Sequence, residues 1–349
     1  MTDRERWDVR GAVRRMEVRR VWYVPQCSGD QCAPGERGDT NSVEFRRDGA
    51  LVGHVGRNPD GSEHGARYEY DGANRLVTST FSGSGGFALI RRHEYDGDGR
   101  LVRIVERLRD GRERVAETYE YGAAGSRTKI VAVDAAGARA AVTAWAVEGS
   151  DACYSAPGTA SVRTVYDASA RTRELLFLDA GGRTLGRAEF LYDAAAHLVE
   201  ETFTRDDPLA GMLDGVKPAE LNALRALLGG EGGISRRLHT YDANGRRVET
   251  VSSVFGPLGR ERHTMAYNER GDCVEDISEG EDRQMNFDAE GRLADDPSGT
   301  TTSRSEARIE YEYDERGNWI RKTVLARNGP DRDFVTSTVE QRTITYYDA

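Results

Sequence analysis

The chain has 349 residues, of which 38% are hydrophobic and 31% charged, and its net charge is -10. Such a polar chain offers little material for one large globular core, and its basic residues are interleaved with acidic ones, which argues against nucleic acid as a partner. The opening residues, MTDRERWDVRGAV, lack the apolar run of a secretory signal, and no segment approaches the roughly 20 apolar residues of a membrane helix. We therefore expect a cytoplasmic protein with no membrane span, or a secreted or cell-surface one if a leader has been removed.

Residues 1–42 are expected to form an N-terminal strand and a loop that contains cysteine. Cys27 and Cys32 lie close together in CSGDQC, so a small disulfide loop and ordinary thiols both remain open. A metal site has less support, because the second nearby pair of a zinc finger is missing and Cys153 and Cys273 stand alone. No metal or other cofactor is predicted.

A short motif recurs from residue 43 onward, at first about every 25 residues. Its copies are FRRDGALV at Phe45, YDGANRLV at Tyr70, YDGDGRLV at Tyr95, YGAAGSRT at Tyr121, YDASARTR at Tyr166, YDAAAHLV at Tyr192, YDANGRRV at Tyr241, YNERGDCV at Tyr267, FDAEGRLA at Phe287 and YDERGNWI at Tyr313. The aspartate can accept hydrogen bonds from nearby backbone amides, and the Gly or Asn at the fifth position permits a positive φ. Each copy therefore predicts a hairpin turn.

A second, looser set of turn sequences, such as RNPDG from Arg57, lies between these copies. Two turn types in each repeat leave two strands of about eight to ten residues, which predicts a continuous antiparallel meander of about twenty strands. In RIEYEYD, Tyr311 and Tyr313 point to one face and Glu310 and Glu312 to the other. We therefore expect an aromatic ladder on one face of the sheet and a charge ladder on the other.

The rhythm is interrupted between residues 205 and 235. Pro218 suits a first helical position, and Leu221, Leu224, Leu227 and Leu228 form one apolar stripe. The predicted fold is all-β: an elongated, twisted or coiled antiparallel ribbon, with β-hairpin repeats over 43–204, a short helical insertion over 205–235, and repeats with a C-terminal strand over 236–349.

The motif resembles the YD-repeat or RHS-repeat family, and this chain resembles a short, stand-alone member without a toxin domain. The resemblance implies a solenoid-like bacterial β-ribbon. Large members coil such ribbons into shells around toxic C-terminal domains, and some repeats are linked with carbohydrate binding, cell-surface contact and bacterial competition.

Sequence signals of catalysis are missing: there is no His-Glu-x-x-His, no Gly-x-Ser-x-Gly and no phosphate loop with its lysine. We therefore expect a non-enzymatic scaffold or interaction protein. The alternatives are a carbohydrate-binding surface module and a partner-binding protein, of immunity or chaperone type, for a related toxin.

Tyrosine rings are the candidate binding groups, for a polysaccharide or a protein partner. Those predicted are Tyr68, Tyr70, Tyr95, Tyr121, Tyr311 and Tyr313. Sugars stack on exposed aromatic rings, but tyrosines at strand ends also stabilise a sheet, and the sequence leaves both roles open.

Overall fold

The computed structural model describes residues 7–28, 31–108, 110–122, 127–132, 147, 150, 154, 156–206, 233–254, 259–283 and 300–348. These residues are strands and turns, with one short 3-10 turn, η1 (Ser84–Gly86). Contacts divide the chain into two compact units, which we call unit 1 (residues 1–115 and 307–349) and unit 2 (residues 116–306). The helix expected over 205–235 falls almost entirely outside the described residues, since Arg205 ends β13 and Gly233 begins β14.

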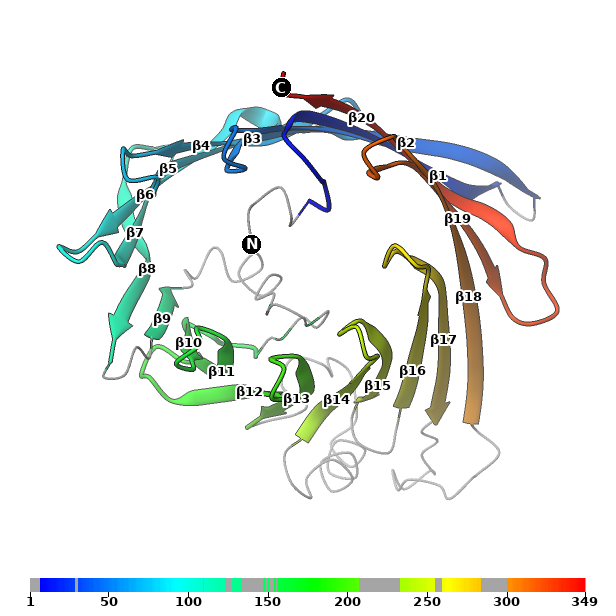
Figure 1. The fold of residues 1–349 in the computed structure, drawn as a ribbon. Coiled ribbons are helices and arrows are strands. Elements are labelled where there is room, and N and C mark those ends of the chain that lie inside the picture. The colour runs from blue at the N-terminus through cyan, green and yellow to red at the C-terminus, as the bar shows by residue number, and fades with distance from the viewer. Residues whose placement is uncertain are drawn as a thin grey trace, which may run out of the picture. The chain divides into compact units, whose positions relative to one another are not determined.

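Strands follow one another as a meander in each unit (Figure 1). Unit 1 contains β1 (Val13–Ser28), β2 (Gln31–Phe45), β3 (Leu51–Arg57), β4 (Glu63–Tyr70), β5 (Leu76–Gly83), β6 (Phe87–Tyr95), β7 (Leu101–Arg107), β19 (Trp319–Asn328) and β20 (Val335–Tyr346). Unit 2 contains β9 (Arg127–Ala132), β10 (Ser161–Tyr166), β11 (Thr172–Leu178), β12 (Thr184–Tyr192), β13 (Leu198–Arg205), β14 (Gly233–Tyr241), β15 (Arg247–Val254), β16 (Gly259–Tyr267) and β17 (Cys273–Arg283). Two strands, β8 (Glu113–Tyr121) and β18 (Thr300–Tyr313), continue from one unit into the other.

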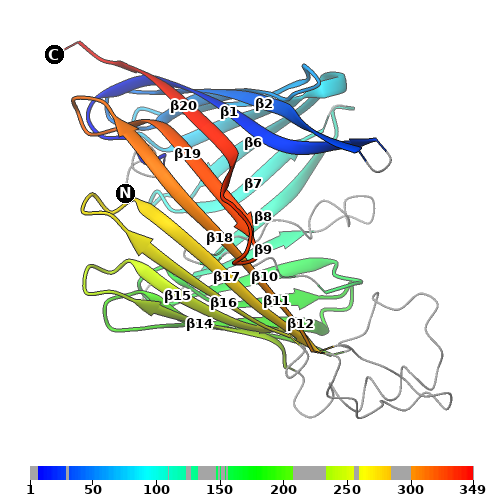
Figure 2. The same cartoon turned by 90° about the vertical axis from the view of Figure 1, so that its right-hand side faces the viewer.

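The first and last strands of the meander pair with each other. Met16 on β1 lies opposite Ile344 on β20 and, on its other side, opposite Val43 on β2. Figure 2 shows β19, β20 and β1 side by side. All the described strands belong to one 20-stranded sheet. The all-β antiparallel meander is thus confirmed, but the open, elongated or solenoid-like ribbon is wrong, because the strand that should have formed one end is hydrogen-bonded to the strand at the other.

The recurring motif forms the predicted hairpin turns. In the copy at Tyr70, the Asp71 N–H donates to the Arg75 carbonyl (2.9 Å), and the Asn74 N–H donates back to the Asp71 carbonyl (3.0 Å). The fifth position has a positive φ in all the described copies that close this way: Gly49, Asn74, Gly99, Ala170, Ala196, Gly245, Gly271 and Gly317. The motif therefore encodes a backbone conformation that glycine adopts freely and alanine adopts with strain.

Each unit has its own apolar cluster on one face of its strands. In unit 2, Phe177, Phe190 and Phe203 are buried together, and Tyr154 from the segment before β10 packs against them. In unit 1, Met16, Val43 and Phe45 are buried under Val9, which precedes β1. Short segments outside the sheet therefore cover one face of each unit and supply the core that the repeats lack.

Candidate functional site

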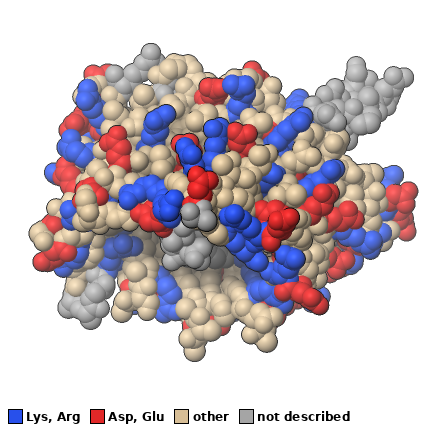
Figure 3. Space-filling view, turned by 45° about the horizontal axis from the view of Figure 1, so that its top comes forward, with Lys and Arg blue, Asp and Glu red and all other residues tan. Residues whose placement is uncertain are grey.

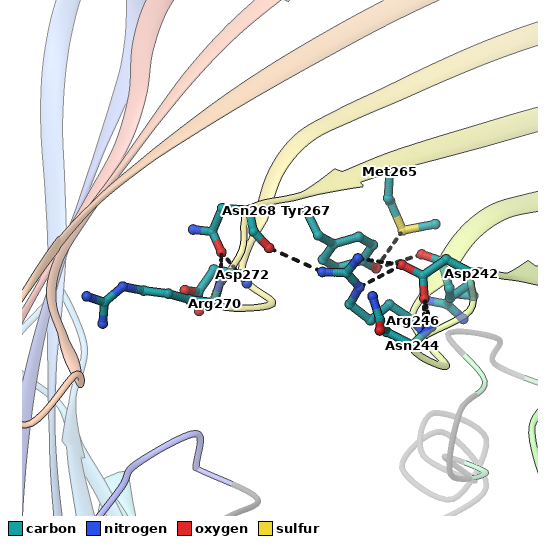
Figure 4. A network of polar contacts seen from close by, with 9 residues as sticks. Asp242, Asn244, Arg246, Met265, Tyr267, Asn268, Arg270 and Asp272 are labelled. Carbon is teal, nitrogen blue, oxygen red and sulfur yellow. Dashed lines mark hydrogen bonds and ion pairs between the residues drawn. The ribbon is translucent and has the colours of Figure 1, made fainter.

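In five described copies of the motif the tyrosine hydroxyl fastens the turn to the preceding repeat. Figure 4 shows the copies at Tyr241 and Tyr267. The Arg246 side chain donates to Asp242 Oδ2 (2.7 Å) and to the Asn268 carbonyl (3.2 Å), and its guanidinium lies over the Tyr267 ring, 5.0 Å from the centroid. The Tyr267 hydroxyl donates to the Arg247 carbonyl (2.6 Å). Hydrogen bonds from Arg246 hold the pKa of Asp242 below its usual value.

The same arrangement recurs at two of the tyrosines predicted to bind a ligand. The Tyr70 hydroxyl donates to the Leu51 carbonyl (2.9 Å) and the Tyr95 hydroxyl to the Leu76 carbonyl (2.8 Å). A hydroxyl used in this way holds its ring at the turn. The structure therefore supplies the stabilising role that the sequence left open, while ligand binding by these rings stays a prediction.

The other predicted tyrosines lie in different surroundings. Tyr68 packs edge-on against Phe81, Tyr311 and Tyr313 stack with centroids 6.0 Å apart, and Tyr121 ends β8. Tyr121 belongs to unit 2 and the other five to unit 1. The six residues are therefore spread over several strands.

The register of β1 and β2 places Cys27 directly opposite Cys32. Cys273 is a free thiol, and Cys153 lies outside the described residues. The disulfide between Cys27 and Cys32 stays a prediction.

Charged side chains are not confined to one face of the sheet, contrary to expectation. Cross-strand pairing runs from Tyr68 to Ser79, then to Arg91 and to Glu106, so that Glu106 shares the face of Tyr68. Glu106 is buried and accepts hydrogen bonds from Arg91 (2.7 and 2.9 Å) and Arg114 (2.9 Å). Two guanidinium groups offset the cost of burying this carboxylate.

A second buried carboxylate, Glu201, joins four other side chains in unit 2. His239 Nε2 lies 2.7 Å from Glu201 Oε1, and His239 Nδ1 lies 2.9 Å from the Thr250 hydroxyl. The hydroxyls of Ser150 (2.5 Å) and Tyr154 donate to Glu201 Oε2. Because Ser150 and Tyr154 precede β10 while the others lie on β13, β14 and β15, this cluster fastens the covering segment to the sheet.

Burial is only one of the influences on the pKa values of Glu201 and Tyr154. Burial by itself would raise the pKa of Glu201, but hydrogen bonds from His239, Ser150 and Tyr154 outweigh it and lower that pKa. Burial, followed by the charge of Glu201, raises the pKa of Tyr154. The cluster therefore holds a buried carboxylate and a neutral phenol, and its place under the covering segment gives it a structural role.

An open groove of about 580 Å³ lies on the exposed face of unit 1. Its lining residues are Arg15, Glu17, Val18, Arg19, Thr40, Asn41, Ser42, Val55, Arg57, Glu63, Gln341 and Thr343. Nine of these form two rows across neighbouring strands, and the other three are Arg15, Val18 and Asn41. The first row is Gln341, Arg19, Thr40, Arg57 and Glu63, and the second is Thr343, Glu17, Ser42 and Val55.

In the first row, Thr40 lies between two arginines. Arg19 and Arg57 each lie directly opposite Thr40, on its two neighbouring strands, so their Cα atoms are roughly 10 Å apart. Arg57 donates to Glu63 (2.5 and 3.1 Å), whereas Arg19 is exposed and has no recorded ion pair within the described part of the chain. Thr40 is thus flanked by an arginine on each neighbouring strand.

The second row supplies hydroxyl groups and one paired carboxylate. Arg15 pairs with Glu17 (2.7 Å) and also donates to the Ser42 hydroxyl (3.0 Å). Both glutamates of the groove are therefore matched by an arginine, and the third arginine leaves one positive charge over. This charge stands on a chain whose net charge is -10.

A metal-binding cluster and a membrane-spanning helix are both absent from the described residues. Among the described residues, no group of three or more His, Cys, Asp or Glu side chains is placed to hold a metal ion. Within that same part of the chain, no helix is long and apolar enough to cross a membrane.

Two porin-like proteins are among the solved structures similar to this chain. A porin-like protein from Bacteroides uniformis matches at 9% identity and a TM-score of 0.34, over 95% of this chain and 96% of its own. A porin-like protein from Bacteroides vulgatus matches at 9% identity and a TM-score of 0.24, over 97% of this chain and 99% of its own. No family model and no curated protein matches the chain.

These findings correct the resemblance drawn from the motif. The matched structures are porin-like and no YD-repeat or RHS-repeat model matches, so the assignment to that family is wrong. The functions that went with it are wrong as well: the repeat scaffold or interaction protein, the carbohydrate-binding module and the partner of a toxin. The expected cytoplasmic location finds no support in these comparisons.

The groove escaped sequence reasoning because its residues come from five strands. Arg19, Thr40 and Arg57 are far apart in the sequence, and only the register aligns them. The sequence offered only a weak signal for the groove, namely arginines at alternating strand positions. That signal is weak because the chain is rich in arginine throughout. Glu201 and His239 were missed for the same reason, since their strands flank the interruption between residues 205 and 235.

Proposed function

We propose that this protein binds a small anionic solute, bearing a carboxylate or phosphate group, in the groove of unit 1. The observation that carries the proposal is the row Arg19, Thr40, Arg57, in which two guanidinium groups flank a hydroxyl. Guanidinium groups bind carboxylates and phosphates through two parallel hydrogen bonds. The groove volume of about 580 Å³ suits a small molecule.

The proposal is one of binding without catalysis. Around Thr40 the groove offers arginine, hydroxyl and amide groups, and its two carboxylates, Glu17 and Glu63, are already paired with arginine. The same pairing makes Glu63 a competitor of the solute for Arg57.

We also propose that both faces of the sheet are in contact with water. In unit 2, Glu249 pairs with Arg262 across β15 and β16 (2.6 Å) on the face opposite to His239 and Thr250. In unit 1, Arg19 and Glu106 likewise occupy opposite faces. Figure 3 shows basic and acidic side chains interspersed over the visible surface.

Calorimetric titration with citrate and with inorganic phosphate tests the binding proposal, with glucose as the uncharged comparison. We expect saturable binding of an anion that weakens as sodium chloride is raised. Arg19→Gln should weaken it about tenfold, equivalent to roughly 1.4 kcal/mol. Glu63→Gln should strengthen it, because Arg57 is then released to the solute.

Arg67→Gln is the matched control. Arg67 is exposed on β4, on the same face as Val55, but does not line the groove. If Arg19→Gln and Arg67→Gln lose affinity equally, the loss comes from the change in net charge and not from the groove. That result would overturn the proposal. Absence of binding to both anions at low salt would do so as well.

A further inference from the structure

Two histidines lie diagonally across β3 and β4, on the face of unit 1 opposite to the groove. His54 on β3 lies across from Ala66 on β4, and His64 on β4 lies across from Gly56 on β3. His54 and His64 are therefore diagonal neighbours on one face, with Cα atoms roughly 7–8 Å apart. At this spacing two imidazole rings can reach a common point between the strands.

Gly56 makes room for one of these rings. A Cβ atom on Gly56 would lie 2.5 Å from His64 Nε2 and 2.5 Å from Asn41 Oδ1. The imidazole nitrogen and the amide oxygen thus stand beside the same point, in a space that any larger residue at position 56 would fill. Asn41 comes from β2, directly opposite Gly56.

His54 supplies a nitrogen with no recorded partner. Its Nδ1 atom is buried and has no hydrogen bond within the described residues. The ring nitrogens of histidine are common metal ligands.

We propose that His54 and His64, with the amide oxygen of Asn41, bind a divalent transition metal ion of the copper, nickel and zinc class. Imidazole nitrogen suits these metals, and affinity within the class is highest for copper(II). Water would complete the coordination, since His64 is exposed. Asn41 also lines the groove, whereas His54 and His64 lie on the other face of β3 and β4.

Paramagnetic broadening by copper(II) tests the site directly. The chain has only six histidines, so each imidazole Cε1–H resonance can be followed and assigned by substitution. We expect the signals of His54 and His64 to broaden together below one equivalent of copper(II), before those of His197, His239 and His263. Copper bound at a cysteine or at the N-terminus does not reproduce this pattern.

Zinc(II) affinity measured by calorimetry adds a second readout. His64→Ala should weaken the binding that depends on this site at least tenfold, and Asn41→Ala should weaken it less. His263→Ala is the control, because this histidine is partly exposed on β16 and pairs with Glu261 (2.9 Å). Simultaneous broadening of all six histidines, or zinc binding that His64→Ala leaves intact, would overturn the proposal. Exposed His64 can be replaced without opening a core, so the variant is expected to fold.

Discussion

Replacing Glu201 by glutamine probes the most deeply buried charge of unit 2. Glu201 is only 1% exposed and accepts hydrogen bonds from Tyr154 and Ser150 beside its contact with His239. The Gln amide oxygen can still accept from the two hydroxyls. Its NH2 group faces His239 Nε2, so the contact between carboxylate and imidazole is lost.

The size of the effect follows from this geometry. Leaving a buried partner of a charged hydrogen bond unsatisfied costs about 1–3 kcal/mol or more, so with the hydroxyl contacts retained Glu201→Gln should cost about 3 kcal/mol. At about 2.1 cal/mol/K per residue, a unit spanning residues 116–306 would lose about 7 °C in Tm if it unfolds cooperatively.

The effect should also depend on pH with a defined sign. The pKa of Glu201 is lowered in the folded protein, so its contribution is fully present above the unfolded value of about 4.3 and is lost as the pH falls through the folded value. The difference in Tm between wild type and Glu201→Gln should therefore shrink in acid.

Thermal unfolding followed by near-ultraviolet circular dichroism at several pH values measures this difference. Glu200→Gln is the control, because Glu200 is the neighbouring residue on the opposite face and pairs with exposed Arg236. A Tm for Glu201→Gln equal to that of Glu200→Gln at pH 7 would refute the reasoning. So would a loss of stability that persists unchanged at pH 3.

Three further predictions concern the turns and the first hairpin. Tyr267→Phe removes the hydroxyl bond to the preceding repeat and should cost about 1 kcal/mol, read as a lower urea midpoint with an unchanged m value; an unchanged midpoint would contradict it. Ala170→Gly and Ala196→Gly should each add about 0.5–1 kcal/mol, because both alanines have a positive φ, and a lower Tm would count against that explanation. Cys27 and Cys32 should form a disulfide in an oxidising buffer, since directly opposed residues have Cα atoms roughly 4.5–5.5 Å apart, within the disulfide range. Mass spectrometry after alkylation without reductant would find both thiols modified if they do not pair.

The hairpin turns could be predicted from the sequence because their determinants are local. Aspartate, a residue with positive φ and the returning arginine lie within five positions, as in the copy from Asp71 to Arg75. Even Ala170 and Ala196, where the glycine is replaced, keep the backbone conformation of the motif. The alternation of side chains along single strands was predictable for the same reason.

Relations between distant strands could not be read in this way. Nothing local to β1 or β20 states that Met16 lies opposite Ile344, and an open ribbon satisfies the same turn sequences. The groove and the histidine pair depend on register as well, because a shift by one residue would move Arg19 or His54 to the other face. Family resemblance failed at the same level, since a turn motif specifies hairpins and not the assembly or function built from them.

Pairing of the first strand with the last also governs how the protein must be made. The Arg10 N–H donates to Asn318 Oδ1 (2.6 Å) across 308 residues, and β1 reaches its second neighbour only when β20 is present. At about 5–20 residues per second, translation of the intervening chain takes roughly 15–60 s, during which the outer edge of β1 has unsatisfied backbone groups. The nascent hairpin of β1 and β2 is thus the segment most in need of protection from intermolecular strand pairing before release from the ribosome.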